Sequence, residues 1–111
     1  MTADVRPLAD SEWELVRYLA GNFFSSHRAE WPLVAEMSDG GMGSLKFVGG
    51  EGRKFGGVVG ACRFDDADGV EVVASLYRDD RGGPLELDVW KVTFEPLIAI
   101  PSPDKFWREA D

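Results

Sequence analysis

The residues best suited to chemistry in this sequence are acidic side chains beside a tryptophan. In the segment LELDVWKVTF, Glu86 and Asp88 are two residues apart, and Trp90 follows after two more. Residues two apart in a β-strand point to the same side, so a strand here places two carboxylates and an indole ring together. With Glu71 from a neighbouring strand, this group would suit a basic protein partner, because tryptophan is enriched among the residues that dominate binding energy.

A paired carboxylate can also serve as acid and base in glycoside hydrolysis. Alternating acids on a strand, however, are usually its solvated face. No serine lies in a nucleophile-elbow context either. We therefore predict no catalytic residue, and we favour a protein that is not an enzyme.

The glycine-rich stretch SDGGMGSLKF, residues 38–47, raises the question of a phosphate site. A P-loop ends in Gly-Lys-Ser/Thr and leads into a helix, whose N-terminus holds the phosphate. Here Lys46 follows Ser44 instead of preceding it, and the next residues resemble a strand. We predict a hairpin turn over residues 38–44, since Asp39-Gly40 between alternating segments is a strong hairpin signal.

One alternative keeps the glycine-rich hairpin as part of a pocket. Arg53 and Lys54 of the RKFG segment would then hold an anion, together with Gly41 and Ser44. In this alternative the protein is a small-ligand or anion binder, or a weak enzyme.

Residue types that bind metals or act as nucleophiles are scarce. His27 is the single histidine and Cys62 the single cysteine, so a structural zinc site is excluded. An EF-hand loop with Gly69 at its sixth position would need acidic ligands where Phe64 and Ser75 stand. We predict no metal and no cofactor, and a buried, inert thiol at Cys62.

Length and charge fit one acidic domain over residues 1–111, with residues 1–9 and 101–111 as flexible or packing arms. The net charge is -8, and residues 65–95 hold nine acidic and three basic residues. This charge disfavours nucleic acid and steers a basic partner toward the protein. With no signal peptide and no long apolar run, we predict a cytoplasmic protein without membrane contact.

The periodicity predicts an α+β fold, in which an N-terminal helix packs on a mainly antiparallel, meander-like sheet of about five strands. Ser11 and Glu14 have capping-box spacing, so the helix is expected to begin at Ser11 and to end near Phe24, or earlier at Gly21. The strands are expected at residues 33–37, 43–48, 57–64, 70–77 and 85–94.

The third and fourth of these strands predict a register. If paired residue numbers sum to 134, Cys62 faces Val72 on an apolar side, and Arg63 faces Glu71 on the other. The second side also carries apolar residues, namely Val59, Ala61 and Val73, and Trp90, Val92 and Phe94 join them unless a bulge near residues 88–90 reverses the phase. We expect this face to be covered by the C-terminal arm with Phe106 and Trp107, by a second subunit, or by a partner.

Three segments, EMSDGGMGSLKF, RKFG and LELDVWKVTF, together resemble a small bacterial family known only as a domain of unknown function. The resemblance extends from Arg6 to Leu97 and implies no activity and no catalytic residue. The residues themselves favour a non-enzymatic interaction protein, such as an immunity-type inhibitor or a regulatory adaptor, that binds a basic protein partner. A homodimer is compatible with the same features.

Overall fold

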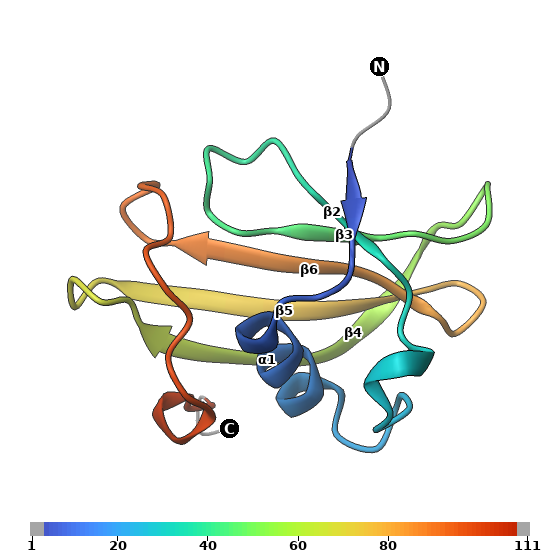
Figure 1. Cartoon of the computed structure of the whole chain (residues 1–111), viewed down its shortest axis with the longest axis horizontal. Coiled ribbons are helices and arrows are strands. Elements are labelled where there is room, and N and C mark those ends of the chain that lie inside the picture. The colour runs from blue at the N-terminus through green and yellow to red at the C-terminus, as the bar shows by residue number, and fades with distance from the viewer. Residues whose placement is uncertain (1–3, 109–111) are drawn as a thin grey trace.

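The computed structural model describes residues 4–108, which form one α-helix, two short 3-10 helices and a six-stranded sheet (Figure 1). The elements are β1 (Val5–Arg6), α1 (Asp10–Ala20), η1 (Arg28–Glu30), β2 (Val34–Glu36), β3 (Leu45–Phe47), β4 (Phe55–Asp65), β5 (Glu71–Asp79), β6 (Pro84–Lys91) and η2 (Pro103–Lys105). The predicted α+β class is confirmed. The outer parts of both predicted arms, 1–3 and 109–111, lie outside the described residues.

The sheet has the order β1-β2-β3-β6-β5-β4, and every neighbouring pair is antiparallel. Strands β4, β5 and β6 form a meander, but β3 pairs with β6, so the sheet is not a meander throughout (Figure 1). The sixth strand, absent from the sequence prediction, is β1. It has only two residues, which is too short to show alternation.

Helix α1 starts at Asp10, one residue earlier than predicted, and ends at Ala20, beside the earlier of the two predicted boundaries. Its N-terminus is capped by Glu12, whose carboxylate accepts a hydrogen bond of 2.8 Å from the Ala9 N–H, so Ser11 is not the cap. Gly21 follows the last helical residue with a φ of 54°. Phe23 therefore lies outside the helix and is 54% exposed instead of packing on its apolar face.

One face of the sheet, which we call the covered face, holds the core. Its buried side chains are Val34, Leu45, Phe47, Cys62, Phe64, Val72, Ala74, Leu76, Leu87 and Val89. Helix α1 lies across β4 and β5, and the chain after β6 returns over the same face (Figure 1). Trp31 packs on Phe47 from the segment after α1, and Phe106 packs on Phe64 from the C-terminal segment.

The predicted register between β4 and β5 is wrong by two residues. Paired numbers sum to 136, so Cys62 faces Ala74 instead of Val72. Between Gly60 and Asp65 this two-residue shift leaves each side chain on its own face, and Arg63 still reaches Glu71 diagonally at 2.6 Å. A bulge between Val58 and Gly60 turns Val59 toward the core, so Val59 is not on the second face as predicted.

Candidate functional site

The opposite face of the sheet, which we call the open face, carries exposed apolar side chains. Its residues are Lys46, Phe55, Val58, Ala61, Arg63, Glu71, Val73, Ser75, Tyr77, Glu86, Asp88 and Trp90. Val58 is 59% exposed and Trp90 40% exposed. The predicted cover by the C-terminal arm is wrong for its aromatic anchor, because Phe106 is buried on the covered face against Tyr18 and Phe64.

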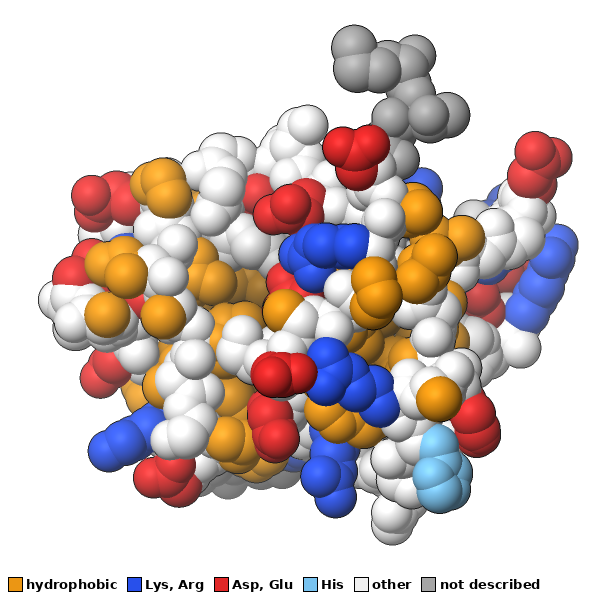
Figure 2. All heavy atoms as spheres, viewed as in Figure 1, with side chains coloured by type: hydrophobic (Ala, Val, Ile, Leu, Met, Phe, Trp, Pro, Cys, Tyr) orange, Lys and Arg blue, Asp and Glu red, His pale blue; other side chains and the backbone are white. Residues whose placement is uncertain are grey.

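The covered side has a mixed surface. Figure 2 shows acidic and basic side chains interspersed with apolar ones around α1 and the C-terminal segment. Ion pairs contribute to this mixture, including Arg6 with Glu12 at 2.7 Å and Arg28 with Asp10 at 2.8 Å. The acidic and aromatic candidates of the sequence analysis belong to the other side of the sheet.

Trp90 and Phe94 form an exposed aromatic pair at one end of the open face. No bulge interrupts β6 near Trp90, which pairs with Val73 on β5. The two ring centroids are 5.8 Å apart, and Phe94 is 69% exposed. Phe94 has a φ of 63°, and it is the one non-glycine residue in 4–108 with a positive φ. A bulky residue in this conformation is strained, and such strain is concentrated at functional sites.

A buried ion pair holds the turn that carries Phe94. Lys91 is 1% exposed, and its Nζ donates to Asp66 and Asp68 at 2.8 Å each. Asp66 also accepts hydrogen bonds from the backbone N–H groups of Ile98 and Ala99. Burial alone would raise the pKa of Asp66, but the hydrogen bonds from Lys91 and from the backbone lower it to about 2.

This ion pair was not predicted from the sequence. A signal was present, since Lys91 continues the alternation of Leu87 and Val89, which are both buried. A lysine at a core position of a strand requires a buried carboxylate partner, because an unpaired buried charge is costly. The acidic loop before β5 supplies that partner, because Lys91 pairs with Val72 at the start of β5.

The three acidic candidates differ in their surroundings. Glu71 forms an ion pair with Arg63 at 2.6 Å. Glu86 pairs across the strands with Tyr77 on one side and Lys46 on the other. Its pKa is raised, first by burial and then by the negative charge of Asp88, although Lys46 acts in the opposite direction.

The sheet edge at β4 is protected, in contrast to the open face. Trp107 forms a two-way backbone bridge with Arg63, with N···O distances of 2.7 and 2.9 Å. Two bulges interrupt the other half of β4, between Phe55 and Gly57 and between Val58 and Gly60. Bulges and covering segments discourage strand addition at an edge, so binding by the face is favoured over pairing with β4.

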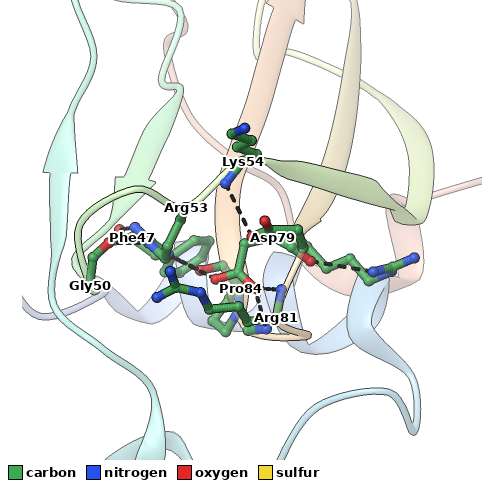
Figure 3. Close-up of polar contacts among 10 residues, drawn as sticks. Phe47, Gly50, Arg53, Lys54, Asp79, Arg81 and Pro84 are labelled. Carbon is green, nitrogen blue, oxygen red and sulfur yellow. Dashed lines mark hydrogen bonds and ion pairs between the residues drawn. The ribbon is translucent and has the colours of Figure 1, made fainter.

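The alternative anion site is divided between the two ends of β3. Arg53 lies after β3, beside a depression of about 380 Å³. Its guanidinium points inward: Nη1 donates to Pro84 O at 3.0 Å and Asp79 at 3.4 Å, Nη2 to Phe47 O at 2.6 Å, and Nε to Gly50 O at 3.2 Å (Figure 3). Arg53 therefore clamps its own loop to β5 and β6.

The other members of that alternative are not beside Arg53. Lys54 is exposed, and its backbone N–H donates to Asp80. Ser44 precedes β3 and is 4% exposed, and its hydroxyl both donates to Val89 O at 3.2 Å and accepts from Val89 N at 2.9 Å. Gly41 lies in the preceding loop, where its carbonyl accepts a hydrogen bond from Leu97 N.

The predicted hairpin at residues 38–44 is confirmed. It joins the antiparallel strands β2 and β3, and the carboxylate of Asp39 accepts hydrogen bonds from Met42 N and Ser44 N. Gly40, Gly41 and Gly43 have φ between 75° and 99°, a region that side chains disfavour. The three glycines thus shape a turn, as the sequence predicted.

Metal and thiol chemistry gain no support in residues 4–108. No group of three or more His, Cys, Asp or Glu side chains in this range is arranged to hold a metal ion. Cys62 is buried, and burial raises the pKa of its thiol to about 11. No helix in the same range combines the length and apolar character needed to span a bilayer.

Comparison with known proteins places the chain in a family. Residues 5–101 match the family described as a domain of unknown function, DUF6984. No curated protein and no solved structure shows a significant match. The chain therefore belongs to DUF6984, in agreement with the resemblance found in its sequence.

Proposed function

We propose that this chain is a non-enzymatic, cytoplasmic interaction domain that binds a basic protein partner through the open face of its sheet. The observation that carries the proposal is the exposed pair of Trp90 and Phe94 on a face whose other side is fully engaged with the core. Partly exposed aromatic residues beside charged groups are typical of binding hot spots.

The negative charge of this chain favours a positively charged partner. The open face carries three acidic residues, Glu71, Glu86 and Asp88, against two basic ones, Lys46 and Arg63, and the whole chain has a net charge of -8. A second copy would bring the same sign of charge to the same face, whereas a basic partner would be attracted. An inhibitor of a basic protein, or an adaptor that recognises one, fits this surface.

The partner can be captured at the residue that should touch it. A photoreactive amino acid at position 90 is expected to cross-link a basic protein in the cells that produce this chain, and the same probe at Glu14, an exposed residue of α1, should not. The purified partner then allows a quantitative test. Trp90→Ala and Phe94→Ala should each weaken binding by at least about tenfold, because hot-spot truncations have effects of this size.

Phe23→Ala is the matched control, because Phe23 is an exposed aromatic residue outside the open face. Its effect on binding should stay within about twofold, the level expected of a peripheral contact. The proposal is wrong if Trp90→Ala binds as tightly as the original chain. It is also wrong if light scattering shows a dimer that Trp90→Ala dissociates, since the open face would then be a self-interface.

A further inference from the structure

The carboxylates of this protein differ in whether they accept short hydrogen bonds. Seven of them within residues 4–108 are buried or half-buried, namely Glu12, Asp39, Asp66, Glu71, Asp79, Glu86 and Asp88. Five accept at least one hydrogen bond of 2.9 Å or shorter, and these are Glu12, Asp39, Asp66, Glu71 and Asp79. Glu86 and Asp88 are the two exceptions.

Asp88 has only long contacts. Ser44 Oγ and Tyr77 OH each lie 3.5 Å from one of its carboxylate oxygens, at the outer limit of hydrogen bonding. Glu86 has no hydrogen bond or ion pair with any described residue at bonding distance. Half-buried charge without short hydrogen bonds is costly, so a cation supplied by a ligand would be strongly favoured here.

The two carboxylates lie beside a row of short side chains on the open face, Ser75 and Ala61, which we call the trough. Asp88 pairs with Ser75, which pairs with Ala61, so this row consists of short side chains. The row of Trp90 and Val73 lies on one side, and the row that includes Tyr77 lies on the other. Adjacent rows on one face are about 7 Å apart, so Trp90 flanks the row of Asp88 and Ser75 on one side. Glu86 and Tyr77 flank it on the other side, and the Tyr77 hydroxyl extends to within 3.5 Å of Asp88.

We propose that this trough receives an arginine side chain of the partner, whose guanidinium binds Asp88 and Glu86 between the rings of Trp90 and Tyr77. The proposal rests on the proposed function, since it specifies how the basic partner is recognised. A guanidinium presents five N–H donors in one plane and stacks on aromatic faces, so it can satisfy two carboxylates about 7 Å apart along a strand. A lysine ammonium offers a more compact charge and no planar face.

The surrounding charges agree with a cationic ligand. Burial raises the pKa of both Glu86 and Tyr77, and the negative charge of Asp88 raises each of them further. Lys46 pairs with Glu86 across the strands, yet it is exposed and acts on Glu86 only through its charge and not through a hydrogen bond. Arg63 lies in the row of Val73 and Trp90, but its guanidinium forms an ion pair with Glu71 at 2.6 Å.

Short peptides can test the trough without the natural partner. The probes are acetyl-Gly-Arg-Gly-amide, the same peptide with lysine, and the same peptide with citrulline, which keeps the shape of arginine without its charge. Each is titrated into the full 15N-labelled chain while the Trp90 Nε1–H and the backbone N–H signals of residues 86–90 are followed by NMR. The arginine peptide should cause saturable chemical-shift changes at these signals. The lysine peptide should bind about threefold or more weakly, and the citrulline peptide should cause no shift changes.

Substitutions of Glu86 and Asp88 test whether the two carboxylates bind the arginine peptide. Asp88→Asn and Glu86→Gln should each weaken binding of the arginine peptide by about tenfold, as expected for loss of a charge-assisted hydrogen bond. Glu14→Gln on α1 is the matched control and should leave the affinity unchanged. Equal binding of lysine and arginine, binding that survives both variants, or tighter binding of Ca²⁺ alone at these residues would each overturn the proposal.

The two proposals fail in different ways. If the captured partner needs Trp90 and Phe94 but tolerates Glu86→Gln, Asp88→Asn and replacement of its own arginines, the interaction function stands and the arginine site is wrong. If the arginine peptide binds the trough but the partner does not depend on Trp90, the arginine site stands and the proposed function is wrong.

Discussion

The two sides of strand β6 handle charge in opposite ways. On the covered face, Lys91 is 1% exposed and lies between two carboxylates, one of which also accepts three backbone hydrogen bonds. On the open face, Glu86 and Asp88 are half-buried without a short hydrogen bond. The ion pairs of Lys91 stabilise the fold, whereas Glu86 and Asp88 remain able to bind a cationic ligand. Substitutions on the two faces should therefore separate stability from binding.

The largest effect is expected at Asp66 on the covered face. Asp66→Asn should lower the free energy of unfolding by about 3–5 kcal/mol, because it leaves the buried Lys91 without its main counter-charge. Chemical denaturation followed by tryptophan fluorescence measures this loss. Asp65→Asn changes an exposed neighbour and should have an effect below about 0.5 kcal/mol. A loss below about 1 kcal/mol at Asp66 would show that the ion pair does not stabilise the fold.

The same substitution has a defined pH dependence. The pKa of Asp66 is lowered to about 2 in the folded chain, from an ordinary value of 3.8. Its stabilisation is therefore fully present above pH 3.8 and is lost as the pH falls toward 2. The difference in unfolding free energy between the original chain and Asp66→Asn should shrink over this interval. A difference that stays constant from pH 5 to pH 2 would contradict the assignment.

A smaller effect is expected where α1 meets the covered face. A Cβ atom placed on Gly60 would lie 2.3 Å from the backbone oxygen of Leu19, so the helix must shift to admit it. Gly60→Ala should cost about 1–3 kcal/mol, as overpacking usually does. Ala61→Ser, one residue further and on the open face, should stay within about 0.5 kcal/mol. Equal effects at both positions would mean that the two faces are not packed differently.

The sequence predicted the parts of this molecule that depend on local patterns. Alternation and turn residues were sufficient for the α+β class, the hairpin before β3 and the burial of Cys62. Strand β1 could not be predicted because two residues carry no period. The bulge at Val59 could not be predicted either, since it depends on how β4 twists against β5 and not on local residue preference.

The sequence predicted which residues share the candidate site but not which of their charges are paired. Alternation placed Glu86, Asp88 and Trp90 on one face, and the structure agrees. The sequence could not show that Glu71 is paired with Arg63 while Glu86 and Asp88 lack short hydrogen bonds, because cross-strand distances depend on a register that was two residues wrong. Nor could it show that Arg53 is committed to its own loop.

On the open face, the strained backbone of Phe94 should lower the stability of the fold. Its φ of 63° costs about 1 kcal/mol for a residue with a Cβ atom. Phe94→Gly should therefore be about 1 kcal/mol more stable than Phe94→Ala, because both lose the ring and only glycine removes the strain. Thermal unfolding of the two variants measures the difference. Equal stability would mean that the turn relaxes and that the exposed ring is not held under strain.

The smallest effect, and the one closest to the arginine site, is expected at Glu86. Its pKa is raised in the folded chain, first by burial and then by Asp88, so folding disfavours its ionised form. This penalty is absent below the ordinary pKa of 4.5 and grows as the pH rises through the folded pKa. Glu86→Gln should then be more stable than the original chain by a few tenths of a kcal/mol at pH 7, and equal to it near pH 3.

Urea unfolding at a series of pH values between 3 and 8 measures this difference. Glu51→Gln, at an exposed position in the loop after β3, controls for the loss of one negative charge from an acidic protein. If Glu86→Gln is instead destabilising at pH 7, Lys46 already satisfies Glu86 within the chain. The contrast between the two sides of β6 would then be lost at this residue, and the arginine site would depend on Asp88 alone.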